Sequence, residues 1–219
     1  MEIAESFKTI KDRIINYEEV AQALQKKTLS YDKAAEEHFN TISALHKALR
    51  GSDPHAGLYY LARMLEAGED PLYIARRLIR FASEDVGIAD PQALVQATTA
   101  YTACHYLGMP ECNVILAQAV VYLALCHKSN SLYTGYEKVK ADVYQTLNES
   151  IPLKIRNPVT KLMKEVGYGK NYKYAHDFAG HVVRGENYLP EKLQGRKYYV
   201  PSDQGLEKRA GEKMRELGL

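Results

Sequence analysis

Three arginines in one short segment are the first residues whose type and spacing suggest chemistry. Arg76 and Arg80 lie four residues apart, which places them on one face of a helix, and Arg77 lies between them. A guanidinium group matches two phosphate oxygens at once, so all three are candidate contacts to the phosphate backbone of DNA. The alternative is an ordinary solvated face whose arginines pair with nearby acids such as Glu84 or Asp85.

A second group of candidates follows near the C-terminal end, where tyrosines alternate with basic side chains. The phosphate-contact candidates are Lys170, Lys173, Arg196 and Lys197, and the base-stacking candidates are Tyr168, Tyr172 and Tyr174. Proteins that bind single strands combine aromatic rings with basic groups in this way. The alternative, which we favour, is that the rings pack against the protein and bond through their hydroxyls.

The charge distribution sets this second region apart. The formal net charge is only +2 over 219 residues, but residues 1–153 carry 15 basic and 19 acidic side chains, whereas residues 154–199 carry 10 and 4. The excess of positive charge therefore lies in the tyrosine-rich segment, where an anionic partner would be attracted.

No catalytic or metal-binding residue is predicted. Cys104, Cys112 and Cys126 are odd in number, lie in apolar stretches and lack the paired short spacing of zinc sites, so we expect buried, reduced thiols. No motif singles out a nucleophile and a base, which leaves an unrelated hydrolase as a remote alternative. The longest apolar stretch, residues 114–126, is interrupted by Gln118 and too short to span a membrane, so a cytoplasmic protein is expected.

The elements that must position these groups are helices. Three Asp-Pro pairs, ending at Pro54, Pro71 and Pro91, each follow a glycine closely. Glycine suits the end of a helix, Asp caps the next one, and proline fits its first turn. These prolines and Pro110 are spaced 17, 20 and 19 residues apart, which leaves room for one helix of three to four turns each time. We therefore predict an all-α fold, a compact antiparallel helical array.

The small-residue helices expected over residues 92–106 and 111–127 should form its centre, because small side chains let helices approach closely. A helix ending at Leu49 is expected to turn five residues inward and to leave His38 and His46 partly exposed. The expected inward set is Ala35, Phe39, Ile42, Leu45 and Leu49. After Pro158 we expect an irregular but ordered Tyr/Lys/Gly-rich tail that wraps over the helical body, with a last amphipathic helix near residues 206–217.

Several uninterrupted runs carry a family resemblance. They are HKALRGSDP at residues 46–54, YLARMLEAGEDPLYIARR at 60–77, FASED at 81–85, LMKEVGYGK at 162–170, YAHD at 174–177 and YLP at 188–190. Together they resemble the C-terminal region of the replication-associated recombination protein A family, also called MgsA or Werner helicase-interacting protein. Its members are AAA+ ATPases related to clamp loaders, and the resemblance covers roughly residues 16–213.

The resemblance implies three regions in a C-terminal fragment. Residues 1–27 would be a remnant of the AAA+ lid, 28–153 a helical oligomerisation domain similar to the clamp-loader collar, and 154–219 a basic tail packed on it. The phosphate-binding loop and the acidic strand for Mg²⁺ do not occur in these residues, so the fragment itself is expected to hold no cofactor and to lack ATPase activity. ATP and Mg²⁺ are implied for the full-length protein.

The resemblance also implies partners and a leading function. The implied partners are further copies of the chain in a homotetramer, forked or single-stranded DNA, and single-stranded DNA-binding protein, in a bacterial cytoplasm at the nucleoid. The leading hypothesis is an assembly domain of an ATPase that acts at stalled replication forks. The alternative is an autonomous DNA-binding module that uses the arginine helix and the basic tail.

Overall fold

The computed structural model describes residues 36–219, so Ala35 and the proposed lid remnant at residues 1–27 lie outside the described part. Residues 36–50 are helical. The α-helices that follow are α3 (Pro54–Glu66), α4 (Pro71–Phe81), α5 (Gln92–Leu107), α6 (Cys112–Leu125), α7 (Ser131–Thr146), α8 (Lys161–Val166) and α9 (Glu207–Leu217). No strand occurs between residues 36 and 219, which confirms the all-α prediction.

Shorter helical turns connect these elements. A π-helical turn, η1 (Ala82–Val86), continues α4, and a 3₁₀ turn, η2 (Gly87–Ala89), follows it. The tail contains four more 3₁₀ turns, at Leu153–Ile155, Ala175–Asp177, Ala179–His181 and Glu191–Leu193.

Two of the three Asp-Pro pairs begin helices as the sequence predicts, whereas at the third the N-cap of α5 is Pro91 and not Asp90. The Asp53 carboxylate accepts hydrogen bonds from the backbone N–H groups of His55 and Ala56, at 2.9 and 3.0 Å. The Asp70 carboxylate accepts equivalent bonds at the start of α4, at 2.9 and 3.1 Å. Each cap satisfies donors that have no partner inside the helix, so the local sequence alone fixes where α3 and α4 start.

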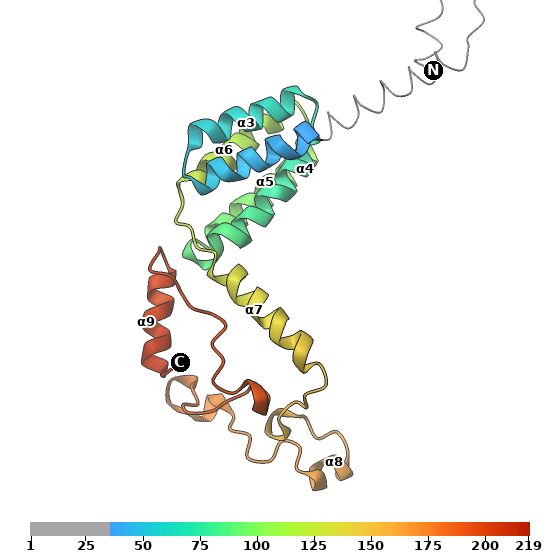
Figure 1. Ribbon diagram of the computed structural model, residues 1–219, viewed down its shortest axis with the longest axis vertical. Coiled ribbons are helices and arrows are strands. Elements are labelled where there is room, and N and C mark those ends of the chain that lie inside the picture. Colours follow the sequence, from blue (N-terminus) through green and yellow to red (C-terminus); the bar gives the residue numbers. More distant parts are fainter. Residues whose placement is uncertain (1–35) are drawn as a thin grey trace, which may run out of the picture.

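Helices α3, α4, α5 and α6 and the helix through residues 36–50 form a bundle with one apolar core (Figure 1). Helix α6 packs against α3, α4 and α5, which confirms the central position expected for residues 111–127. Helix α5 packs on α4 and α6 with one face and is exposed on the other, so the expectation that residues 92–106 also lie at the centre is wrong. Its buried side chains include Leu116, Val120 and Leu123, and α5 contributes Ala93, Ala97 and Ala100. Cys104 and Cys112 are buried in this core, as expected, whereas Cys126 is only partly buried.

Two expectations for the helix through residues 36–50 are wrong, namely a buried Phe39 and a partly exposed His46. Ile42, Leu45 and Leu49 are buried, but Phe39 is 65% exposed and His46 is only 7% exposed. Near the start of this helix the inward position is taken by His38, whose ring lies 4.7 Å from that of Tyr73. The next residue is turned by about 100° around the helix axis, so Phe39 points toward solvent.

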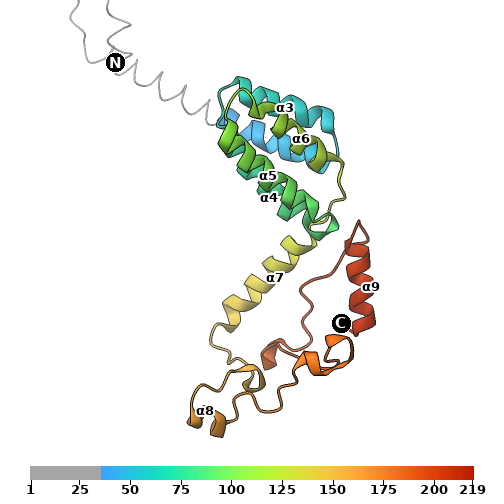
Figure 2. The same ribbon diagram turned by 180° about the vertical axis from the view of Figure 1, so that it is seen from behind.

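Beyond α6 the chain leaves the bundle (Figure 1). Helix α7 packs against η1 and η2 and extends away from α3, α4, α5 and α6, and the short helix α8 lies at the opposite end of the molecule from the bundle in both views (Figures 1 and 2). The tail therefore lies along and beyond α7 instead of wrapping over the helical body, because α7 carries it away. We call residues 131–206 the arm.

The returning end of the arm passes close to α7 and to η2. A Cβ atom at Gly135 would lie 2.6 Å from the backbone oxygen of Tyr198, so only glycine permits this approach. The Leu206 N–H donates to the Ala89 oxygen at 2.9 Å. At Gly205 the backbone has φ +50°, and a Cβ there would lie 2.1 Å from the same Ala89 oxygen.

The last helix, α9, lies where the sequence predicts it. A buried carboxylate at its start holds it in place through hydrogen bonds. Glu207 begins α9 and is fully buried. Its carboxylate accepts bonds from the hydroxyls of Ser129 and Ser131, from the backbone N–H and hydroxyl of Ser202, and from the Tyr199 hydroxyl. Burial acts to raise the pKa of Glu207, but these bonds outweigh it and lower the pKa.

Candidate nucleic-acid interface and assembly surface

Arg76 and Arg80 lie on the exposed side of α4, and each is paired with an acid. Arg76 Nη2 lies 3.3 Å from Asp70 Oδ2, and its guanidinium carbon lies 5.9 Å from the centre of the Tyr73 ring. Arg80 Nε donates to Glu84 Oε2 at 2.6 Å. Both side chains remain about half exposed, so the pairs are weak and a phosphate could compete for either guanidinium.

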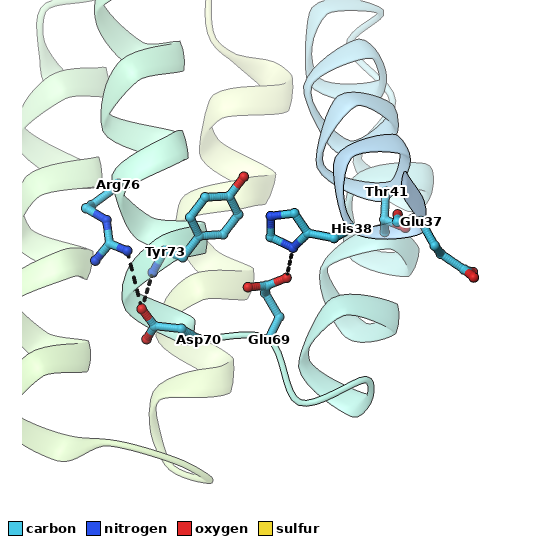
Figure 3. A network of polar contacts seen from close by, with 7 residues as sticks. All are labelled: Glu37, His38, Thr41, Glu69, Asp70, Tyr73 and Arg76. Carbon is cyan, nitrogen blue, oxygen red and sulfur yellow. Dashed lines mark hydrogen bonds and ion pairs between the residues drawn. The ribbon is translucent and has the colours of Figure 1, made fainter. Parts of the chain in front are cut away.

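Figure 3 shows how Arg76 is held in a wider polar network. Asp70 bridges the N–H of Tyr73 and the Arg76 guanidinium, while the neighbouring Glu69 bonds His38 Nδ1 on the facing helix. Asp70 therefore partly neutralises the charge of the Arg76 guanidinium beside it. Such pairing is the alternative that the sequence left open for the arginine helix.

Arg77 does not pair with an acid of the neighbouring loop or turn as Arg76 and Arg80 do, but lies beside the helix through residues 36–50. Its side chain lines a pocket together with His46 and Arg50 from the helix through residues 36–50. The three arginines are thus close in sequence but do not form one phosphate-binding face. Consecutive residues on a helix are separated by about 100°, which is enough to send Arg77 to a different surface.

The tail brings some of its candidates together in a pocket of about 540 Å³, which we call the tail pocket. Among the residues that line it are Lys154, Arg156, Tyr168, Tyr172 and Tyr188. The Arg156 guanidinium lies 5.1 Å from the centre of the Tyr168 ring and donates to the Tyr168 hydroxyl at 3.1 Å. Aromatic faces beside cations are the combination that stacks bases and holds phosphates.

The remaining tail candidates have separate surroundings. Lys173 Nζ pairs with Glu186 at 2.9 Å, and Arg196 Nε lies 3.3 Å from Asp142 on α7. Lys170, Lys197 and Tyr174 are exposed. Since α4 belongs to the bundle and the tail pocket lies near α8, the arginine helix and the tail candidates occupy different parts of the molecule (Figure 2).

One acid controls the charge beside the tail pocket. Glu186 accepts bonds from Lys154 at 2.5 Å and from Lys173 at 2.9 Å. Hydrogen bonds from these two ammonium groups lower the pKa of Glu186 to about 2, so it is ionised throughout the physiological range. Two lysines surround one carboxylate, and the cluster keeps a net positive charge.

Sequence reasoning missed three residues of the tail pocket. Lys154, Arg156 and Tyr188 line it but were not among the candidates. The charge excess after residue 153 was the available signal for Lys154 and Arg156. The contact itself joins Arg156 to a tyrosine 12 residues later, which only the folded chain reveals.

The arm presents large apolar side chains to solvent. Helix α7 buries only Ser131 and Gly135, and between residues 136 and 206 only Leu193 is buried. The large exposed apolar residues include Tyr144 at 86% and Val159 at 82%, together with Val143, Leu147, Ile151 and Leu162. An ordered segment with so little core of its own is typical of a surface that another chain covers.

The side chains and helices of residues 36–219 also bear on metal binding and on membrane insertion. Nowhere in that range do three His, Cys, Asp or Glu side chains gather closely enough to hold a metal ion. Nor does any helix within it have both the length and the apolar character needed to cross a membrane.

Comparison with known proteins places the chain among its relatives. Residues 51–218 match the family model described as MgsA AAA+ ATPase C terminal, and residues 1–50 match the model described as AAA C-terminal domain. Over 202 residues the chain is 43% identical to Replication-associated recombination protein A of Escherichia coli (strain K12), which covers 92% of this chain and 45% of that protein.

Two further relatives agree. Identity is 48% over 184 residues with Replication-associated recombination protein A of Coxiella burnetii, covering 84% of this chain and 42% of that protein. It is 42% over 190 residues with ATPase WRNIP1 of Dictyostelium discoideum, covering 87% and 22%. The chain spans less than half the length of these relatives. The match of residues 51–218 to the family model and this level of identity lead to one conclusion: the chain belongs to the MgsA AAA+ ATPase C-terminal family.

Proposed function

We propose that this chain is the assembly domain of a DNA-dependent AAA+ ATPase that acts in replication, recombination and repair at stalled forks. Its relatives carry the names Replication-associated recombination protein A and ATPase WRNIP1, which supports the replication and ATPase parts of the proposal. In the whole protein, ATP and Mg²⁺ would then bind outside the residues of this chain. Several copies, in a homotetramer, would hold the ATPase regions side by side.

The exposed apolar surface of the arm is the observation that carries this proposal. Only Leu193 is buried between residues 136 and 206, yet this segment follows a defined path with many internal hydrogen bonds. Burying apolar surface contributes about 25 cal/mol per Å², so covering these side chains would stabilise an assembly strongly. A second copy offers the same surface, as a symmetric interface requires.

Light scattering of the purified chain tests the proposal. We expect a mass that is a multiple of the 24.7 kDa chain. Tyr144→Asp and Leu147→Asp should reduce this mass to that of one chain, because each places a charge in the covered surface. Tyr106→Asp is the matched control, since Tyr106 is exposed on α5 of the bundle at 79%. A wild-type chain that stays monomeric at high concentration contradicts the proposal.

A second candidate function is DNA binding by the tail pocket. It is favoured by Arg156 against Tyr168 and by the two lysines around Glu186. We expect Arg156→Ala to weaken binding of a labelled single strand or fork by about tenfold in fluorescence anisotropy. Tyr172→Ala separates the two interpretations: a lower melting temperature with unchanged affinity supports a purely structural tyrosine.

The two candidate functions require different binding partners. Assembly needs only further copies of the chain, whereas tail-pocket binding needs forked or single-stranded DNA. Binding of single-stranded DNA-binding protein is a third possibility that we propose from the family alone. A tetramer without DNA affinity would assign DNA contact to the ATPase region of the whole protein.

A further inference from the structure

A pocket of about 350 Å³ lies between the helix through residues 36–50 and α4. The residues of this bundle pocket that matter here are Phe39, Ser43, His46, Arg50, Tyr73 and Arg77. It is distinct from the tail pocket, which is built from Lys154 and later residues. It also takes no part in the arm surface that supports the proposed assembly.

Two nitrogen atoms beside this pocket are buried without a hydrogen-bond partner among the described residues. They are His46 Nε2 and Arg77 Nε. The His46 side chain is only 7% exposed. A buried polar atom without a partner costs about 1 to 3 kcal/mol, so a bound molecule that supplied acceptors to these two atoms would recover that cost.

The charge of the pocket is positive. Arg50 is engaged by Asp85 through two bonds, Nε to Oδ1 at 2.5 Å and Nη2 to Oδ2 at 3.0 Å. No carboxylate between residues 36 and 219 forms an ion pair with Arg77, unlike Arg76 and Arg80 on the same helix. Among residues 36–219, the Arg77 charge at the pocket therefore has no carboxylate counter-ion.

The pKa of His46 responds to the positive charge of this pocket. Burial first, then the charges of Arg77 and Arg50, lower its pKa to about 4, while Asp85 and Glu84 oppose the shift. At neutral pH the ring is uncharged, so it can donate one N–H bond to an oxyanion. An anion in the pocket would reverse part of the shift, because it stabilises the charged imidazolium.

The pocket also offers aromatic faces. Tyr73 and Phe39 both line it, and Phe39 is far more exposed than its apolar character favours. An aromatic side chain exposed beside a cationic pocket can stack on a flat ring. The volume exceeds what a phosphate group alone would fill.

From these contacts we infer that the bundle pocket binds the phosphoryl group of a nucleotide, with Arg77 and His46 on the oxygens and Tyr73 and Phe39 against the ring. The nucleotide is either free or the 5′-terminal unit of a DNA strand, since both present the same phosphoryl group and ring. Arg77 forms the charged contact. The inference stands apart from the proposed assembly, because all its residues lie in one chain's bundle.

Calorimetric titration of the 219-residue chain with inorganic phosphate and with thymidine 5′-monophosphate tests the site. We expect both to bind, the nucleotide more tightly. Arg77→Gln should weaken both by about tenfold, since it removes a charge-assisted bond. Arg76→Gln is the matched control: Arg76 precedes Arg77 on the same helix, pairs with Asp70, and should change affinity by less than twofold.

Two oligonucleotides of one sequence, with and without a 5′-phosphate, identify the source. Tighter binding of the phosphorylated strand, lost in Arg77→Gln, assigns the pocket to strand ends. Equal binding of the two strands, together with binding of the mononucleotide, assigns it to free nucleotides. Equal losses in Arg76→Gln and Arg77→Gln would overturn the pocket in favour of a general phosphate face.

A second measurement does not depend on a variant. The His46 ring signals in an NMR pH titration should show a higher pKa in the presence of phosphate than in its absence. His55 serves as the internal control, since it lies outside this pocket. No binding of phosphate or nucleotide at concentrations up to about 10 mM, with an unmoved His46 pKa, would refute the inference.

Discussion

Glu207 shows how a single residue can hold two distant segments together. Its carboxylate joins Ser129 and Ser131, which precede and begin α7, to Ser202 and Tyr199 in the returning tail. Burial of a charge is costly unless hydrogen bonds surround it, and here donors come from both segments. The residue therefore fixes where α9 lies relative to the start of α7.

Removing the charge should release this contact. We expect Glu207→Gln to lower the free energy of unfolding by about 2 to 3 kcal/mol, because an amide cannot accept from so many donors at once. Urea denaturation measures the loss, and faster hydrogen exchange in α9 locates it. Glu212→Gln, at an exposed position of the same helix, is the control and should change little.

The lowered pKa of Glu207 also makes the contact sensitive to acid. Because the pKa is lower in the folded than in the unfolded chain, the carboxylate adds stability above its unfolded pKa near 4.5. That contribution is lost as the pH falls through the lower folded pKa. We expect wild-type stability to decline more steeply than that of Glu207→Gln below about pH 4.5; parallel curves in thermal melts would contradict this.

Phe81 and Phe39 separate a core aromatic from an exposed one. Phe81 is fully buried, with its ring 5.5 Å from that of His46, whereas Phe39 is mostly exposed. We expect Phe81→Ala to cost about 3 to 5 kcal/mol and Phe39→Ala less than about 0.5 kcal/mol. Chemical denaturation of both variants checks this, and a large loss from Phe39→Ala would show that its ring is covered.

At the scale of elements, the close approach of α7 to the returning tail depends on Gly135. Its missing side chain lets the Tyr198 backbone come within contact of the helix, and the Tyr198 hydroxyl donates to Asp142 one to two turns further along, at 2.9 Å. The tail and α7 are therefore one packing unit, although 56 residues separate these two partners.

A methyl group at Gly135 should separate the two segments. We expect Gly135→Ala to destabilise the arm by about 1 to 3 kcal/mol, even though alanine is the better helix former, because the contact is with rigid backbone. Hydrogen exchange should increase near residues 198–206. Lys138→Ala, at an exposed position one turn away, is the control and should leave exchange there unchanged.

At the scale of the whole molecule, the bundle and the arm differ in what stabilises them. The bundle has a continuous core from Ile42 to Ala124, whereas the arm buries little of its own surface. If other copies cover the arm, its stability must depend on concentration, while that of the bundle need not.

We therefore expect the melting temperature of the arm to rise by about 3 °C for each tenfold increase in protein concentration. Circular dichroism, or tyrosine fluorescence from the tyrosine-rich arm, follows the transition. Tyr144→Asp should abolish the dependence without altering the bundle transition. A concentration-independent melt of the wild-type chain would argue for an arm that is stable alone.

Short-range features of this fold could be predicted from the sequence. The starts of α3 and α4 follow from Asp53 and Asp70, because a cap bonds to N–H groups only two or three residues away. The central place of α6 follows from its small apolar side chains, and the family from uninterrupted runs of residues. Each of these depends on neighbours in sequence or on composition.

The tertiary structure alone decided which side chains meet. In the folded chain Arg77 lies beside His46, whereas Arg76 and Arg80 pair with acids. Glu207 is buried against Ser129, 78 residues earlier. The fold also carries the tail away from the bundle on α7. Such contacts depend on the relative rotation and separation of whole helices, which local sequence patterns do not specify.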